Sequence, residues 1–261
     1  MKLRHIIPLS LSYVFLFNSL SYPETSQYFD SDGNSLSSGS RTRETSLSYG
    51  VQGSYIPEGV ELQKDIRYEF FPVFGKTFSD IVRSAEENSP ADLKNKRRLP
   101  SRAVWVLGWS YKIAHSYGID EEDKTVHVAV EIYDINITCD FTITLPALID
   151  DSALNPAEKN LWKNYYLRLI EYESDHARII RDKEAQEELR KKFGELSYVI
   201  FEYSADIDIQ KTVETFIRKE TEKIGSAWAK NLKKRIGEYD LTTEFGLALQ
   251  KRGSFFRQKE K

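Results

Sequence analysis

Residues 155–194, "NPAEKNLWKNYYLRLIEYESDHARIIRDKEAQEELRKKFG", predict a long amphipathic helix, which decides the kind of fold the chain forms. Asn155 suits an N-cap, and Pro156 suits the first helical position because its missing N–H would have no partner there. Glu158 reaches back to the cap and completes a capping box. Large side chains then recur every three or four residues in one apolar stripe: Trp162, Tyr165, Leu169, Tyr172, His176 and Ile179. Gly194 suits a C-cap, so we expect one uninterrupted helix up to that residue.

The segments before this helix alternate between apolar and polar residues, which predicts strands. The strand patterns cover residues 66–75, 103–113, 124–135 and 139–146, and an amphipathic pattern at 76–90 predicts a short helix. Two strands have a clear apolar face, formed by Trp105, Leu107 and Trp109 in one and by Val126, Val128, Val130 and Ile132 in the other. The connections are short, so we expect a mostly antiparallel sheet.

A second long helix is expected from about Asp206 to Arg235, after a short strand-like segment at 196–203. Strands followed by helices are typical of one fold class. The sequence therefore predicts an α+β fold, with a mostly antiparallel sheet followed by two long helices.

The start of the chain is typical of an export signal. In residues 1–21 a basic start precedes an apolar run, and small residues follow at the spacing that a signal peptidase reads. The run is too short and too interrupted for a good membrane span, and no later segment is apolar enough to span a membrane. The alternative is that residues 1–21 stay uncleaved as an amphipathic anchor. Residues 22–54 are polar and Ser-rich and predict a flexible tether, which leaves one folded domain at 55–261. We expect a periplasmic, cell-surface or secreted protein.

Charge and cysteine content exclude several classes of protein. The formal net charge is -3, so nothing in the charge favours a nucleic-acid partner. Cys139 is the only cysteine, which rules out an intramolecular disulfide and a zinc site of thiolates. It lies in a strand pattern, where we expect a buried, inert thiol. The sequence has no G-x-S-x-G elbow and no glycine loop for phosphates.

The stretch "EYESDH" at 171–176 differs at one position from H-E-x-x-H, the helix-borne zinc motif of metallopeptidases. In that motif two histidines four residues apart point at one ion, and the glutamate polarises the zinc-bound water. Glu173 and His176 are in register here, but Tyr172 stands at the first histidine position. Taken alone, a histidine on an apolar helical stripe is more often a hydrogen-bonded core residue.

Other segments give this stretch a context. "ENSP", "VWVLGWSY", "TITLP", "LWKNYYLRLIEYESDHARI" and "EYDLTTEFG" follow one another between about residues 66 and 250. In this order they resemble a family of predicted secreted bacterial zinc-dependent proteases (domain of unknown function 922). The resemblance implies a zincin-like metallopeptidase architecture and a last motif of the form Y-D-x-x-T-x-H-G. The residues that match its motifs are Trp162, Tyr239, Asp240, Thr243 and Gly246, whereas Phe245 replaces the histidine that the resemblance implies as third ligand.

Two of the three implied zinc ligands are therefore aromatic residues, Tyr172 and Phe245. His176 is the only remaining presumptive ligand, and Glu173 is a vestigial general base. Phenylalanine donates nothing to a metal, and tyrosine binds only as a phenolate, against an ordinary pKa of about 10. We expect the two rings to fill the former metal position and to stack on each other. Replacement ligands are the alternative, and the candidates are His115, His127, Glu171, Asp175 and Asp240, although helical periodicity turns Glu171 and Asp175 away from the stripe.

These observations predict an exported, catalytically inactive relative of zinc metallopeptidases that needs no cofactor and binds a peptide or protein partner along the former cleft. The first alternative is an active zinc-dependent peptidase with unconventional ligands. In that case Glu173 is the general base, His176 a ligand, and Tyr172 a ligand or an oxyanion stabiliser. The second alternative is a structural envelope protein whose long helices present an interaction surface.

Overall fold

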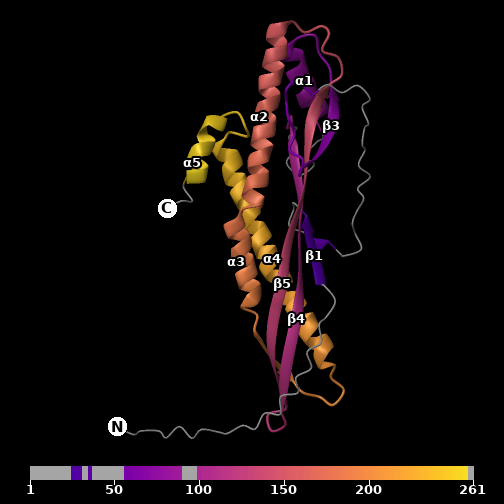
Figure 1. Ribbon diagram of the computed structural model, residues 1–261, viewed down its shortest axis with the longest axis vertical. Helices are drawn as coiled ribbons and strands as arrows, with labels where there is room; N and C mark the ends of the chain where they lie inside the picture. The colour runs from indigo at the N-terminus through magenta and orange to yellow at the C-terminus, as the bar shows by residue number, and fades with distance from the viewer. Residues whose placement is uncertain (1–24, 31–34, 37–55, 90–98, 258–261) are drawn as a thin grey trace, which may run out of the picture. The chain divides into compact units, whose positions relative to one another are not determined.

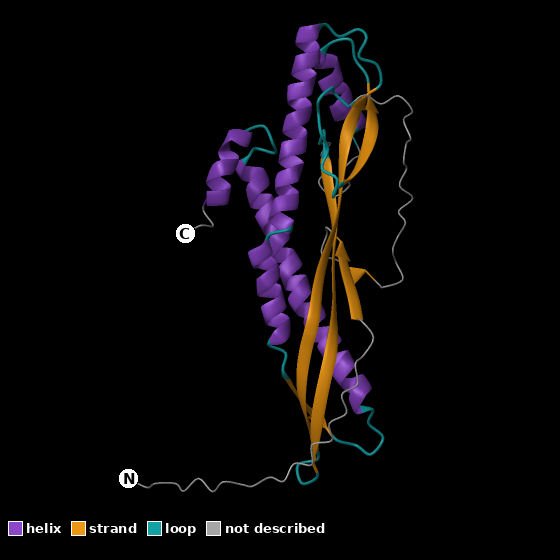
Figure 2. Ribbon diagram, in the orientation of Figure 1, coloured by secondary structure: helices purple, strands orange, loops and turns teal. Residues whose placement is uncertain are grey.

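The computed structural model describes residues 25–30, 35–36, 56–89 and 99–257, and it contains both strands and helices (Figures 1 and 2). The strands are β1 (Thr25–Asp30), β2 (Ser35–Leu36), β3 (Arg67–Val73), β4 (Arg102–Asp120), β5 (Thr125–Leu148) and β6 (Tyr198–Glu202). The helices are α1 (Phe78–Asn88), α2 (Pro156–Ile180), α3 (Lys183–Gly194), α4 (Ile209–Thr242), the 3-10 turn η1 (Leu249–Lys251) and α5 (Arg252–Arg257). The mixed α+β class expected from the sequence is confirmed.

The chain divides into two compact units, whereas the sequence predicts one folded domain at 55–261. Unit 1 comprises Met1–Thr25, Ser110–Asn136 and Arg190–Ile224, and unit 2 comprises Ser26–Trp109, Ile137–Leu189 and Gly225–Lys261. The expected signal peptide at 1–21 lies outside the described residues. Strands β1 and β2 fall within residues 22–54, so these two parts of the expected tether are strands.

Six strands form a sheet in the order β2-β1-β4-β5-β3, and β6 also pairs with β5. The pair β5–β6 is antiparallel, as expected, and so is the pair β1–β2 in the segment expected to be a tether. Strand β3 instead runs parallel to β5, with Arg67 opposite Thr142 and Val73 opposite Leu148. A parallel pair needs a long connection, and here α1 and β4 supply it by returning the chain to the end at which β3 begins. None of the described helices is long and apolar enough to cross a membrane.

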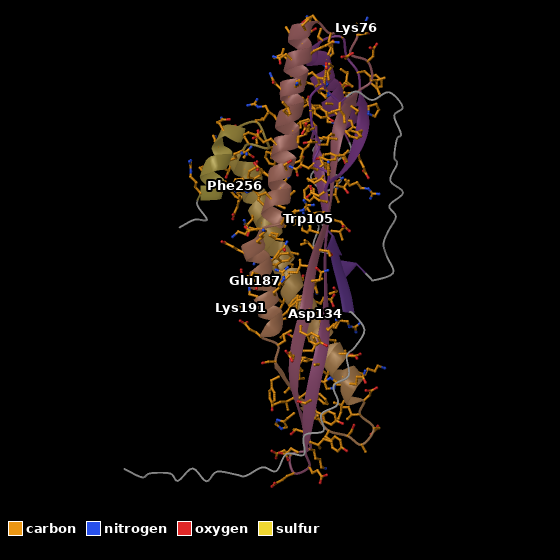
Figure 3. All side chains as sticks on the ribbon, viewed as in Figure 1. Lys76, Trp105, Asp134, Glu187, Lys191 and Phe256 are labelled. Carbon is orange, nitrogen blue, oxygen red and sulfur yellow. The ribbon has the colours of Figure 1, made fainter. Side chains whose placement is uncertain are left out.

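Strand β5 spans two segments, 124–135 and 139–146, that the sequence predicts as separate strands. Its buried apolar side chains occupy even-numbered positions at first and odd-numbered ones later: Val126, Val128, Val130 and Ile132, then Phe141, Ile143, Leu145 and Ala147. Between the two sets, Asp134 has a φ of 52°, in the left-handed region (Figure 3). One extra residue in that conformation is typical of a bulge, which shifts the side-chain alternation by one. The strand therefore continues while its alternation changes.

The expected long helix begins as predicted but is interrupted. The Asn155 side chain accepts a hydrogen bond from the Glu158 amide at 3.0 Å, as the capping box predicts. Helix α2 ends at Ile180, however, and α3 starts at Lys183. Between them the Asp182 carboxylate accepts hydrogen bonds from the amides of Glu184 and Ala185 at 3.0 and 3.2 Å. Because an aspartate that binds these amides caps a new helix start, the single helix up to Gly194 is wrong.

Within unit 2, α4 lies directly against strand β4 at one glycine. A Cβ added to Gly225 would lie 2.0 Å from the Trp109 ring, which is 1% exposed. Only a residue without a side chain allows the helix to approach that ring so closely. This contact fixes the part of α4 that leads to Tyr239 and Asp240, near the end of the helix.

Candidate functional site

The motif residues meet in unit 2, where α2 carries Tyr172, Glu173 and His176 and the end of α4 carries Tyr239 and Asp240. All three α2 side chains and Tyr239 are buried, and Asp240 is half-buried. The stripe spacing on α2 brings positions 172 and 176 to the same side, one turn apart. The site is thus a contact between two helices, with its polar groups enclosed.

His176 is bonded to a carboxylate at each ring nitrogen. Its Nδ1 lies 2.9 Å from Glu173 Oε2, and its Nε2 lies 2.8 Å from Asp240 Oδ1. Burial lowers the pKa of this imidazole, but the hydrogen bonds and charges of Asp240 and Glu173 outweigh burial and raise the pKa to about 9. The ring is therefore an imidazolium at neutral pH, and both nitrogens donate.

Tyr172 and Ser101 extend this chain of hydrogen bonds at its two ends. The Tyr172 hydroxyl donates to Asp240 Oδ1 at 2.5 Å, and the Ser101 hydroxyl donates to Glu173 Oε1 at 2.6 Å. Burial first, and then the Asp240 charge, raise the pKa of the Tyr172 phenol far above its ordinary value, so it stays protonated. Sequence reasoning missed Ser101, because it precedes Glu173 by 72 residues and no local motif marks it.

The residue at the other replaced ligand position, Phe245, lies in a left-handed turn that follows α4. Glu244, Phe245 and Gly246 all have left-handed φ values, of 52°, 56° and 87°. This turn lays the Gly246 backbone on the Tyr172 ring, where a Cβ would lie 3.2 Å from Cγ, and leaves Phe245 37% exposed. The ring that stacks on Tyr172 is Tyr239, at 5.8 Å between centroids and 22° between planes. Tyr239 is thus a stacking partner that the sequence did not indicate, and the stacking of Tyr172 on Phe245 stays a prediction.

A second polar cluster adjoins the first through Tyr239. Its hydroxyl donates to Asp175 Oδ2 at 2.7 Å, and Arg252 Nε lies 3.5 Å from the same oxygen. Arg252 also forms an ion pair with Glu171 through Nη1. Burial raises the pKa of Asp175, which the Tyr239 hydrogen bond and the Arg178 charge partly offset. Glu171 and Asp175, which were expected to point away from the Tyr172–His176 stripe, thus both form ion pairs with Arg252. Arg252 is a residue that sequence reasoning missed.

The other residues that match the family motifs, and the other candidate metal ligands, have contacts outside this cluster or are buried in the core. Trp162 and Thr243 are 3% and 0% exposed, and the Thr243 hydroxyl donates to the Tyr239 carbonyl at 2.9 Å. In unit 1, His127 Nδ1 lies 2.5 Å from the Tyr198 hydroxyl, and burial lowers the pKa of His115. Cys139 is half-buried, and burial raises the pKa of its thiol to about 11, so it stays protonated.

Zinc, the metal that the resemblance implies, would need lone pairs from the side chains at positions 172, 176 and 245. His176 has no free lone pair while both its nitrogens donate to carboxylates, and the Tyr172 oxygen carries its proton. Phe245 offers no donor atom. Within the described residues, no group of three or more His, Cys, Asp or Glu side chains has the geometry to hold a metal ion. The residues as arranged do not fit zinc.

Comparison with known proteins places the chain in a family. Residues 68–246 match the profile of a bacterial protein family of unknown function, DUF922. The chain therefore belongs to this family, whose description names no reaction and no ligand. No curated protein matches the chain, and no solved structure matches it.

Proposed function

We propose that this protein is an exported, non-catalytic member of the family that binds a peptide or protein partner at the face of unit 2 formed by α2 and the end of α4. One observation carries the proposal, namely that both nitrogens of His176 are held by Glu173 and Asp240. An imidazolium between two carboxylates is already satisfied and offers no lone pair to a metal and none to a proton. The cluster holds two helices together and performs no metal-dependent hydrolysis.

Exposed apolar side chains beside the cluster support a role in binding. Leu241, Phe245 and Leu247 are 71%, 37% and 78% exposed. Leu241 lies at the end of α4, and the turn that carries Phe245 and leads to Leu247 keeps Glu244 and Phe245 at left-handed φ values, which costs on the order of 1 kcal/mol for each such residue. Adjacent exposed apolar residues held in a strained turn are typical of interaction surfaces. A partner that covers them gains apolar contact without rearranging the buried cluster.

An active peptidase is the second candidate, because three donor atoms converge at Asp240. Its Oδ1 lies 2.8 Å from His176 Nε2 and 2.5 Å from the Tyr172 oxygen. A metal at this point would need His176 to lose a proton and Asp240 to act as an additional ligand, with Glu173 as general base. This candidate predicts that zinc binding releases protons.

Metal analysis of the purified protein separates the two candidates. The protein is incubated with zinc, dialysed, and assayed for bound metal and for chelator-sensitive cleavage of an unfolded polypeptide. We expect no stoichiometric zinc and no cleavage. Stoichiometric zinc, together with cleavage that a chelator abolishes, contradicts the proposal.

A further inference from the structure

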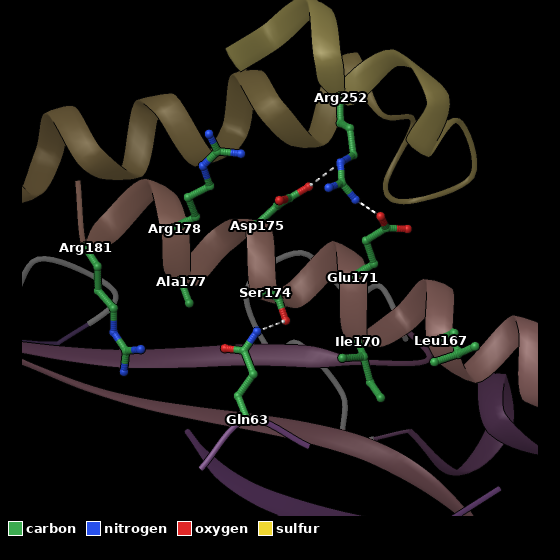
Figure 4. Close-up of a pocket in the computed structure, with 10 residues that line it drawn as sticks. All are labelled: Gln63, Leu167, Ile170, Glu171, Ser174, Asp175, Ala177, Arg178, Arg181 and Arg252. Atoms are coloured by element: carbon green, nitrogen blue, oxygen red, sulfur yellow. Dashed lines mark hydrogen bonds and ion pairs between the residues drawn. The ribbon is translucent and has the colours of Figure 1, made fainter. Parts of the chain in front are cut away.

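The segment that follows α4 docks on the two helices of the site. Residues 249–257, which form η1 and α5, lie beyond the part of the chain that matches the family profile, 68–246. Arg252 reaches from this segment to α2, where it forms an ion pair with Glu171 and approaches Asp175 to 3.5 Å (Figure 4). One arginine therefore bridges two carboxylates one helical turn apart.

Two aromatic residues of the same segment pack on the site. Phe255 lies edge-on to Tyr239 at 5.3 Å between centroids, and the Phe256 ring lies 5.9 Å from the Tyr239 ring. The Arg178 guanidinium also lies over the Phe256 ring, with its Cζ 4.1 Å from the ring centroid. The segment thus makes an arginine contact and a double aromatic contact, three residues apart.

Leu249 anchors the segment in the buried cluster of Tyr172 and Tyr239, whereas the contacts of its other residues are those of a ligand docked on a surface. The side chains of Arg252 and Glu171 are 33% and 49% exposed, and both phenylalanines are only partly buried. A cavity of about 610 Å³ adjoins Arg252 and is lined by Asp175, Arg178 and other residues of α2. Short segments with exposed contacts open more readily than the elements beneath them. The residues beneath this segment, in contrast, belong to the two long helices α2 and α4.

We propose that residues 249–257 act as an internal ligand of the surface formed by Glu171, Asp175 and Tyr239, and that a partner peptide of the same chemistry binds there in exchange. The chemistry is an arginine followed, three residues later, by an aromatic pair. Asp175 favours an arginine, since its side chain is 7% exposed and its Oδ2 lies 3.5 Å from Arg252 Nε. This inference rests on the proposed function and names the class of partner.

The test uses the full chain and a fluorescently labelled peptide, Leu-Gln-Lys-Arg-Gly-Ser-Phe-Phe-Arg, which copies residues 249–257. A released variant, Arg252→Ala with Phe255→Ala and Phe256→Ala, weakens the internal docking. We expect fluorescence anisotropy to show binding at least about tenfold tighter to the released variant than to the wild type. Adding Glu171→Gln and Asp175→Asn to the released variant abolishes the gain, and a peptide with alanine in place of its first arginine binds neither protein.

Lys234→Ala is the matched control, because Lys234 also pairs with a glutamate, Glu238, at 3.7 Å on the surface of α4. This variant keeps the affinity of the wild type. Equal affinity of the released variant and the wild type overturns the inference, and so does equal binding of the peptide without its first arginine. Circular dichroism checks that each variant is folded.

Hydrogen exchange on the wild type gives a second readout if the released variant does not fold. Excess peptide should displace residues 249–257, so their amides exchange faster while those near Tyr239 stay protected. No change in exchange overturns the inference. Zinc-dependent cleavage would refute the proposed function and leave the peptide result standing, so the two failures are distinguishable.

Discussion

The imidazole of His176 on α2 and the carboxylate of Asp240 on α4 form a hydrogen bond of 2.8 Å that joins the two helices. In the second candidate function a metal ion would occupy this junction. Here a cation that belongs to the protein itself, the imidazolium, lies between two carboxylates.

The stability of the protein is expected to fall as the pH rises through about 9. The ordinary pKa of His176, 6.5, is raised to about 9 in the folded protein. A raised folded-state pKa means that the contribution is fully present below about pH 6.5 and disappears as the pH passes about 9. A shift of this size corresponds to a contribution of the order of 3 kcal/mol. Thermal melts between pH 6 and pH 9.5 measure it, and His176→Gln should flatten the dependence; an unchanged slope in that variant contradicts the assignment.

Replacing Tyr172 with phenylalanine should destabilise the protein by about 1–3 kcal/mol, because Asp240 loses the hydroxyl that donates to it at 2.5 Å. The matched control is Tyr166→Phe on the same helix. Tyr166 is 0% exposed, and its hydroxyl has no hydrogen-bond partner among the described residues, so its removal should cost nothing or stabilise the fold. Denaturant unfolding of both variants measures the difference, and equal effects would contradict the role of the Tyr172–Asp240 bond.

The Gly246→Ala variant should lose about 1–2 kcal/mol of stability. The residue has a φ of 87°, and a Cβ there would press on the Tyr172 ring at 3.2 Å. Gly237→Ala is the control, since position 237 is helical and a Cβ meets nothing within 4 Å. That change should stabilise α4 by about 0.5–1 kcal/mol. Melting temperatures of both variants test the pair, and a loss at both positions would rule out the turn as the cause.

Restoring histidine at both replaced positions, Tyr172→His with Phe245→His, should create zinc affinity. The double variant supplies two new imidazoles, and with three imidazoles available zinc can displace the proton that holds His176 to Asp240. We expect zinc to bind roughly tenfold or more tightly to the double variant than to either single variant, as measured by dialysis against a competing chelator. A folded double variant that binds no better than Tyr172→His alone would disprove the role assigned to position 245.

Local chemistry in the sequence predicted the start of α2 and the buried faces of β4 and β5. A capping box and an alternating pattern act over a few residues, so they can be read directly from the chain. The break at Asp182 could not be predicted in this way, because the charged pattern of α3 continues that of α2. The aspartate that ends one helix is equally compatible with a helix surface.

The contacts of the candidate site were less predictable than its residues. Tyr172, Glu173, His176 and Asp240 were identified from motifs, but their partners depend on which segments meet after folding. Ser101 and Arg252 come from distant segments and belong to no motif. The left-handed turn at 244–246 lays Gly246 on the Tyr172 ring, and backbone conformations of this kind at Glu and Phe are rarely indicated by composition.

The left-handed residue Asp134 has a consequence for how β5 tolerates change in length. Because the bulge absorbs this extra residue, removing Asp134 would leave a regular strand in which the same side chains face water. Removing one residue from a regularly alternating part of β5, such as Ala129, would instead reverse the faces of the residues on one side of the deletion. A single-codon deletion should therefore be tolerated better at position 134 than at position 129.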